Sequence, residues 1–149
     1  MNREQIYLVK KTFKKIAPIS EQAAALFYAK LFDLDPKLQG LFKGDVREQG
    51  RKLMQVISYA VDNLERIDEI VPQVRALGAR HAGYGVEERD YDAVGMALLW
   101  TLEKALSLEF TTEAKEAWAA LYELLAETMK EAARQKTENS SHVVFQRQL

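Results

Sequence analysis

The stretch IVPQVRALGARHAGYGV, residues 70–86, decides the fold class and holds the most informative side chain of the chain. Its apolar residues recur every three or four positions, which places them on one face of a helix. The four residues that share this face are Ile70, Val74, Leu77 and His81. Gly83 and Gly85 follow and break the helix. The stretch therefore predicts a helix that ends with a histidine on an otherwise apolar face.

The same helical periodicity covers most of the remaining chain, and no stretch alternates as a strand does. The first predicted helix runs from a capping box at Asn2 and Gln5 to Pro18, and the second from Ser20 as N-cap to before Pro36. The third runs from a capping box at Asp45 and Glu48 to Leu64, and the fourth from about Asp68 to His81. The last two cover about residues 88–107 and 112–134. The sequence thus predicts one all-α domain over residues 1–134. Residues 135–149 lose the periodicity, and we expect a mobile tail in which residues 143–145 could dock.

Composition excludes several classes of protein. The chain has 149 residues, 48% hydrophobic and 29% charged, with a net charge of −1 and no cysteine. The charge balance argues against nucleic acid as a partner, and the missing cysteines exclude disulfides, thiolate zinc sites and iron–sulfur clusters. No apolar run approaches the roughly 18 residues of a membrane span, and the N-terminus lacks the apolar core of a signal peptide. We expect a cytoplasmic protein without a membrane partner.

His81 is the strongest candidate for chemistry, because the other histidine, His142, lies in the polar tail. A histidine at this place is either a core residue bonded to a carbonyl, a partner of a helix C-terminus, or a metal ligand. A lone histidine without cysteines cannot complete a zinc site made of protein alone. It can supply the single protein bond that a haem iron needs.

Tyr28 and Gln49 are polar residues on helix faces that are otherwise apolar. Tyr28 could be a core ring with its hydroxyl at the rim, and Gln49 an exposed residue of a first turn. Buried, each would cost about 1–3 kcal/mol without a hydrogen-bond partner. Together with His81 they resemble donors gathered around a ligand. The chain contains no GxGxxG, Walker or GxSxG motif that would point to other chemistry.

Five stretches, in this order and at these spacings, resemble bacterial single-domain globins, which are related to the haem domains of flavohaemoglobins. The stretches are FYAKLFDLDPKLQGLF (27–42), EQGRKLMQV (48–56), ARHAGYGV (79–86), RDYDAVG (89–95) and AWAALYELLA (117–126). The resemblance covers about residues 3–134, and it implies an all-α globin fold that holds haem b and its iron.

The resemblance carries over residue by residue. It makes His81 the proximal ligand of the iron through Nε2, and we expect its Nδ1–H to donate to the Leu77 carbonyl. It makes Tyr28 and Gln49 the distal polar residues and Leu53 the aliphatic residue above the iron. The other expected haem contacts are Phe42, Leu77, Val86 and Tyr91, with Lys52 and Arg80 as partners of the propionates.

One position departs from the flavohaemoglobin pattern. A histidine, a tyrosine and a glutamate of the last helix form a proximal relay in that group. His81 and Tyr91 match, whereas the glutamate position falls on Ala133 and the nearest acid, Glu131, is out of phase. The resemblance therefore does not extend to the tuning that this relay provides.

The resemblance implies a haem globin that reversibly binds dioxygen, and also nitric oxide and carbon monoxide, with high affinity, for oxygen transport or scavenging. It implies a monomer or a weak dimer, and no catalytic residue. The alternative is a nitric oxide dioxygenase that detoxifies nitric oxide with an external reductase. A haem-free helical interaction protein remains the third reading.

Overall fold

The computed structural model describes residues 1–42 and 44–148, with side chains as far as residue 136. Over these residues the chain forms helices and no strand. In chain order the elements are α1 (Arg3–Ile16), η1 (Ala17–Ile19), α2 (Ser20–Leu34), η2 (Pro36–Leu41), α3 (Val46–Asp62), η3 (Leu64–Ile70), α4 (Val71–Gly83), α5 (Asp90–Leu106), η4 (Ser107–Glu109) and α6 (Thr112–Gln148), where η marks a 3₁₀ helix. The all-α fold is confirmed.

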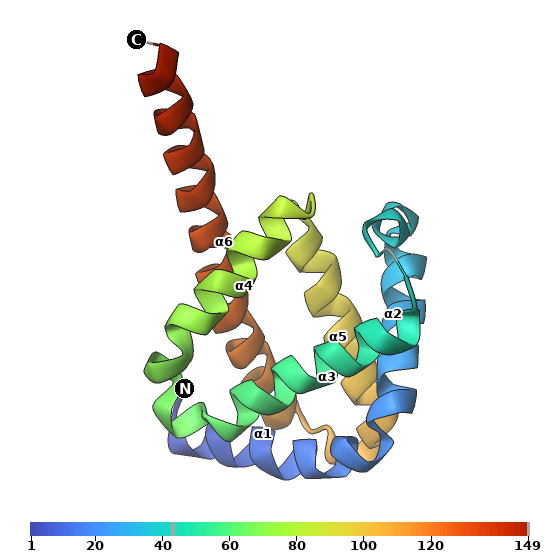
Figure 1. Cartoon of the computed structure of the whole chain (residues 1–149). Helices are drawn as coiled ribbons and strands as arrows, with labels where there is room; N and C mark the ends of the chain where they lie inside the picture. Colours follow the sequence, from blue (N-terminus) through green and yellow to red (C-terminus); the bar gives the residue numbers. More distant parts are fainter. Residues whose placement is uncertain (43, 149) are drawn as a thin grey trace.

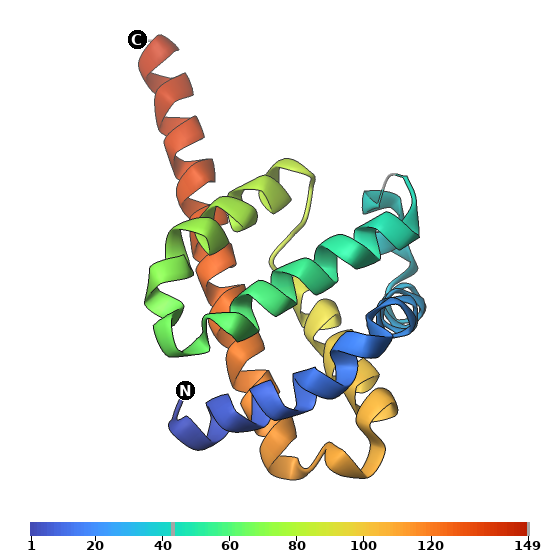
Figure 2. The same ribbon diagram turned by 60° about the horizontal axis from the view of Figure 1, so that its bottom comes forward.

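The helices pack at steep angles rather than side by side as in a bundle (Figure 1). α2 packs against α3 and α5, α4 packs against α6, and α1 crosses beneath them against α6. In two views the C-terminal end of α4 and the first half of α3 stand apart, on either side of the start of α5 (Figures 1 and 2). The last turns of α6 project beyond the other helices (Figure 2).

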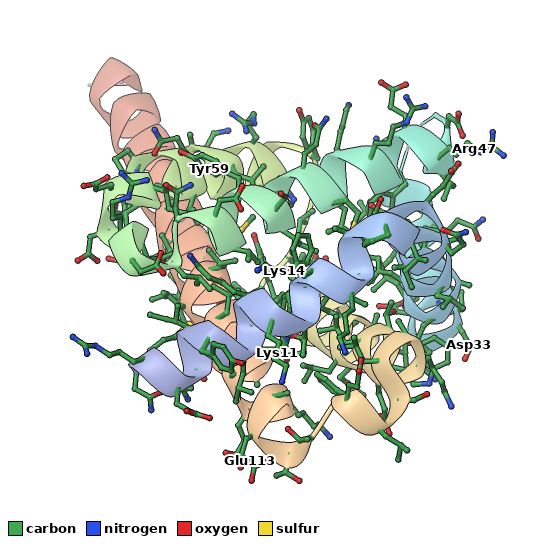
Figure 3. All side chains as sticks on the ribbon, turned by 90° about the horizontal axis from the view of Figure 1, so that it is seen from below. Lys11, Lys14, Asp33, Arg47, Tyr59 and Glu113 are labelled. Carbon is green, nitrogen blue, oxygen red and sulfur yellow. The ribbon has the colours of Figure 1, made fainter. Side chains whose placement is uncertain are left out.

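The main core lies where α1, α5 and α6 meet. The apolar periodicity of these helices places large side chains there, among them Val9, Phe13, Leu102 and Trp118. Trp118 is 1% exposed, and its Nε1–H donates to the Thr12 hydroxyl at 2.8 Å. That hydroxyl in turn donates to the carbonyl of the preceding turn. The outer face of α1 carries exposed lysines, Lys11 and Lys14 among them (Figure 3).

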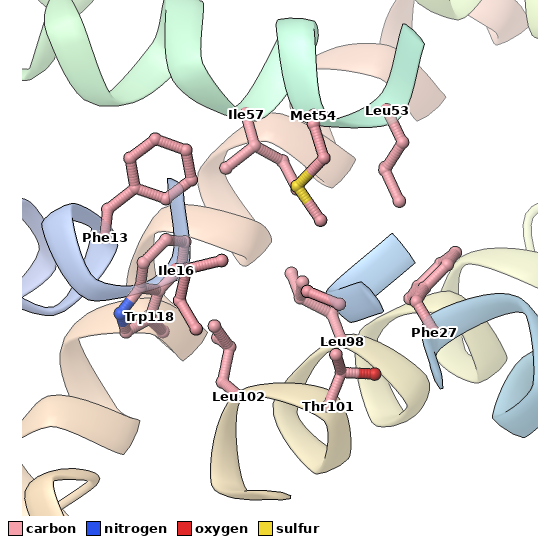
Figure 4. Close-up of a pocket in the computed structure, with 11 residues that line it drawn as sticks. Phe13, Ile16, Phe27, Leu53, Met54, Ile57, Leu98, Thr101, Leu102 and Trp118 are labelled. Carbon is pink, nitrogen blue, oxygen red and sulfur yellow. The ribbon is translucent and has the colours of Figure 1, made fainter. Parts of the chain in front are cut away.

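A small cavity lies inside this core (Figure 4). It has a volume of about 10 Å³, close to the least that one water molecule needs, and its lining is almost entirely apolar. Leu53 and Met54 of α3 and Leu98 of α5 face it from opposite sides. Leu53, a candidate site residue, lines it, so the cavity borders the candidate site on the α3 side.

The N-terminal caps follow the sequence fully in one case, in part in a second, and not in the third. Asn2 and Gln5 form the predicted capping box. Asp45 is the N-cap of α3, but its side chain accepts from the Arg47 amide and the predicted box with Glu48 is not formed. The prediction that Ser20 caps α2 is wrong. η1 carries the chain from α1 into α2 in a helical conformation, so Ser20 has helical dihedral angles (φ −58°, ψ −35°) where a cap needs extended ones.

The last helix is longer than predicted. α6 continues to Gln148, past the expected end near residue 134. Just past residue 134 the sequence has Gln135, Lys136 and Glu138, which favour helix without an apolar face. Side chains beyond residue 136 lie outside the described residues, so the expected mobility of the tail and the docking of residues 143–145 stay predictions. No helix in the described part of the chain is long and apolar enough to cross a membrane.

Candidate functional site

His81 lies half-buried in the last turn of α4. Its Nδ1 is 2.8 Å from the carbonyl oxygen of Leu77, as expected from the sequence. A carbonyl can only accept, so Nδ1 carries the proton and Nε2 keeps its lone pair. Burial lowers the pKa of His81, the bond to Leu77 opposes this shift, and the charge of Arg80 adds to it. At neutral pH the ring is therefore neutral, with Nε2 free to bind a metal.

The turn after His81 is a Schellman motif, which explains the glycines that break the helix. The Val86 amide donates to the His81 carbonyl at 3.1 Å, and the Gly85 amide donates to the Ala82 carbonyl at 3.1 Å. Gly85 has a φ of +94°, which disfavours any residue with a Cβ. Tyr84 closes the helix, and its amide donates to the His81 carbonyl at 3.0 Å. The backbone of His81 is thus fixed by the turn that follows it.

Gly78 sets the position of α4 on α6. It is buried, and a Cβ added there would lie 2.5 Å from both Cα and O of Met129. The two helices therefore meet backbone against backbone at this point. This close approach, three residues before His81, is a determinant of the site that sequence reasoning missed, because a glycine inside a helix does not reveal what it contacts.

Tyr28 lies in an aromatic cluster between α2 and the chain that follows η2. It is 5% exposed, and its ring makes edge contacts with Phe27 and Phe42, with ring centroids 5.0 Å and 5.2 Å away. Phe32 packs on both Tyr28 and Phe42. Burial raises the pKa of the Tyr28 hydroxyl to about 12, so it stays protonated and can donate.

Tyr28 and Gln49 lie next to each other, as the hypothesis of a shared site requires. The Tyr28 hydroxyl donates to the backbone carbonyl of Gln49 at 3.2 Å, across the contact between α2 and α3. Gly50 makes this approach possible, because a Cβ there would lie 2.8 Å from the Cβ of Ala24. The half-buried Leu53, one turn further along α3, packs into the same apolar cluster as Tyr28.

A second apolar cluster lies on the α4 side. Leu77 and Val86 pack there with the buried Tyr91 and with Met129 of α6. The Tyr122 hydroxyl donates to the backbone carbonyl of Tyr91 at 2.6 Å. The structure therefore gathers these residues around two apolar clusters. The first holds Tyr28, Leu53 and Phe42, with the Gln49 carbonyl bonded to Tyr28. The second holds Leu77, Val86 and Tyr91, with His81 bonded to the Leu77 carbonyl.

A cation and a carboxylate both lie near Tyr91. The ammonium of Lys130 lies 5.8 Å from the centre of the Tyr91 ring and forms an ion pair with Glu127. Burial and the nearby Asp90 raise the pKa of Tyr91. Sequence reasoning had looked for a carboxylate here and did not single out Lys130.

Lys52 and Arg80 are exposed, and neither takes part in an ion pair within the described residues. Their positive charges are therefore available to an anionic ligand.

These residues fit haem b. Its iron needs a neutral imidazole with a free Nε2, its apolar ring needs apolar walls, and its propionates need cations at the rim. His81 provides the imidazole, and the two apolar clusters provide the walls. Lys52 and Arg80 provide the cations at the rim. Within the described residues no three His, Asp or Glu side chains gather as a metal cluster would require.

The chain is similar to known proteins in sequence and in structure. The Globin family model matches residues 25–129. The chain is 26% identical to a flavohemoprotein of Halalkalibacterium halodurans over 95% of its length, and it spans only 35% of that protein. It is also 26% identical to neuroglobin of Danio rerio, over 91% of this chain and 94% of neuroglobin. A crystal structure of a bacterial globin from Campylobacter jejuni superposes with a TM-score of 0.82 and 23% identity, covering 92% of this chain and 99% of that one.

The family match covers well over half of the chain, and the relatives are haem proteins by name or globins by fold. Membership of this family implies haem binding. The chain belongs to the globin family.

Proposed function

We propose that the protein reversibly binds dioxygen, and also carbon monoxide and nitric oxide, on haem b held by His81. The observation that carries this proposal is the position of the Tyr28 hydroxyl beside Gln49, where α2 packs against α3. His81 lies on a different helix, α4. Haem b, when bound, would supply a ferrous iron that binds a diatomic gas and shifts electron density onto it.

His81 would provide the protein ligand of the iron. The Leu77 carbonyl holds its Nδ1 proton and fixes the plane of the ring. A carbonyl, unlike a carboxylate, does not draw the proton off Nδ1, so the ligand is a neutral imidazole. Leu77, Val86 and Tyr91 form the apolar wall around it.

Tyr28 and Gln49 would act on the gas ligand from the contact between α2 and α3. At 3.2 Å, the bond from Tyr28 to the Gln49 carbonyl is longer than the 2.7–2.8 Å usual for a hydroxyl donor. A gas ligand that carries negative charge is a better acceptor, so the hydroxyl turns to it at little cost. The side-chain amide of Gln49 can donate to the same ligand.

The surroundings of Tyr28 strengthen this interaction. Phe27, Phe32 and Phe42 enclose its ring and keep water away. In such apolar surroundings a hydrogen bond is stronger than in water. Lys52 and Arg80 remain at the surface, where they can pair with the propionates.

Ligand dissociation from Tyr28→Phe tests the proposal. A hydrogen bond to a charged acceptor contributes about 1.5–3 kcal/mol, so we expect dioxygen to dissociate about 10- to 150-fold faster from the variant. Carbon monoxide gains little negative charge, and its dissociation rate should change by less than about threefold. Tyr59→Phe, which alters an exposed tyrosine of α3, serves as the matched control. An unchanged dioxygen rate in Tyr28→Phe would overturn the assigned role.

Nitric oxide dioxygenation is the second candidate. The same pair of donors favours it, because a dioxygen molecule that dissociates slowly has time to meet nitric oxide. Repeated additions of nitric oxide to the dioxygen-loaded protein, with NADH and a lysate of the host, separate the two functions. One turnover followed by arrest supports a dioxygen binder, whereas continued consumption that is lost in His81→Ala supports a dioxygenase served by an external reductase.

A further inference from the structure

We propose that three successive residues of α6, Arg134, Gln135 and Lys136, position His81 from outside the haem site. We call these residues the proximal clamp. The inference rests on the proposed function, since it concerns the histidine that holds the iron. It assigns a role to a part of α6 that the family match, which ends at residue 129, does not include.

Each residue of the clamp contacts a different segment around His81. The ammonium of Lys136 donates to the carbonyl of Ala79, two residues before His81, at 3.1 Å. The side chain of Gln135 accepts a hydrogen bond from Arg75, one and a half turns earlier in α4. Arg134 forms an ion pair with Glu88, in the loop between α4 and α5. The segment that contains His81 is therefore in contact with α6 both before the histidine, at Arg75 and Ala79, and after it, at Glu88.

The last turn of α4 suits the ammonium of Lys136. Carbonyl groups at a helix C-terminus carry partial negative charge, and a cation there is favourable. Gly83 lies beside this ammonium: a Cβ at this position would lie 3.2 Å from the Lys136 Nζ, a distance from which the flexible lysine can move away by a few tenths of an ångström.

The clamp adds polar contacts to a helix that already packs closely on α6. Gly78 and Met129 meet at a close backbone approach, and Val74 and Leu77 join Met129 in the apolar cluster beside it. The polar contacts before and after His81 add to this packing and restrict small movements of the end of α4. A change of a few tenths of an ångström in the position of an iron ligand alters the strength of its bond, so we call the clamp residues positioning residues.

Lys136→Met and Arg134→Met in the full chain test the clamp, with Lys115→Met as matched control. Lys115 is an exposed lysine in the first turn of the same helix, far along the sequence from the clamp. The first readout is amide hydrogen exchange of residues 84–86 in the haem-free protein, because these amides bond to carbonyls of the last turn of α4. Each clamp variant should speed this exchange about two- to fivefold, as the loss of one exposed polar contact allows.

The second readout is the iron–histidine stretching band in the resonance Raman spectrum of the ferrous haem protein. We expect the band to shift or broaden in both clamp variants and to stay unchanged in Lys115→Met. The charge exchange of Arg134→Glu with Glu88→Arg should restore the wild-type band.

The outcomes separate the two proposals. Wild-type exchange rates and an unchanged band in the clamp variants, with haem bound, overturn the clamp and leave the proposed function intact. A wild-type protein that takes up no haem overturns the proposed function, and the exchange rates of the haem-free variants still decide whether the clamp holds α4.

Discussion

Replacing Gly78 by alanine tests how closely α4 is held against α6. The added Cβ would lie 2.5 Å from Cα and O of Met129 and 2.8 Å from its carbonyl carbon, whereas ordinary contacts begin at 3.4 Å. All three atoms belong to the backbone, so no change of rotamer relieves the overlap. α4 must move away from α6 by about 1 Å, and it carries His81 with it.

The cost follows from two opposing effects. Overpacking of a well-packed interface costs about 1–3 kcal/mol, and alanine recovers up to about 1 kcal/mol because it favours helix more than glycine does. We therefore expect Gly78→Ala to lower the free energy of unfolding by about 1–2 kcal/mol. Urea denaturation of the haem-free chain, followed by far-ultraviolet circular dichroism, measures this difference.

Gly83→Ala, at the end of the same helix, is the matched control. Its Cβ would meet only the flexible end of Lys136, at 3.2 Å, so this variant should be as stable as the wild type to within about 0.5 kcal/mol. In the haem protein, Gly78→Ala should also shift the iron–histidine band. If Gly78→Ala is as stable as Gly83→Ala, the two helices do not meet backbone against backbone, and the reasoning about the placement of His81 is refuted.

Three further predictions concern single groups. Gly85→Ala forces a side chain into the left-handed region and should cost about 1–2 kcal/mol in urea denaturation, while a loss below about 0.3 kcal/mol would contradict the Schellman turn. Thr12→Val leaves the indole N–H of Trp118 without its acceptor and should cost about 1–3 kcal/mol, and a stability equal to wild type would show that another group accepts this hydrogen bond. Because the pKa of Tyr28 rises from 10.0 to about 12 on folding, the unfolded chain loses this proton first as pH rises. Stability should therefore fall between pH 10 and about 12, and this part of the loss should be absent in Tyr28→Phe; equal slopes in the two proteins would contradict it.

The sequence predicted best what depends on spacing along one helix. His81 lies one turn after Leu77, so the bond from its Nδ1 to the Leu77 carbonyl could be expected, and the structure contains it. Tyr28 and Gln49 interrupt apolar faces, and the structure places them side by side. The acceptor is the backbone carbonyl of Gln49, which no side-chain pattern reveals. The roles of these three residues toward haem stay proposals.

What the sequence could not predict depends on contacts between distant segments. Gly78 has an ordinary place in a helical pattern, and only the packing of α4 on α6 shows why a larger residue would not fit. The contacts of residues 134–136 lie at the predicted end of the domain, because loss of apolar periodicity predicts loss of helix. Ser20 had the composition of a cap, but the 3₁₀ turn before it kept the backbone helical.

The most direct test of the central proposal is the iron–histidine stretching band of the ferrous protein in His81→Gly, recorded with and without added imidazole. The chain has one other histidine, His142, and His142→Ala is the control. We predict that the band is present in the wild type and in His142→Ala, disappears in His81→Gly, and returns when imidazole replaces the missing side chain. A band that persists in His81→Gly without imidazole would contradict the proposal that His81 holds the haem iron.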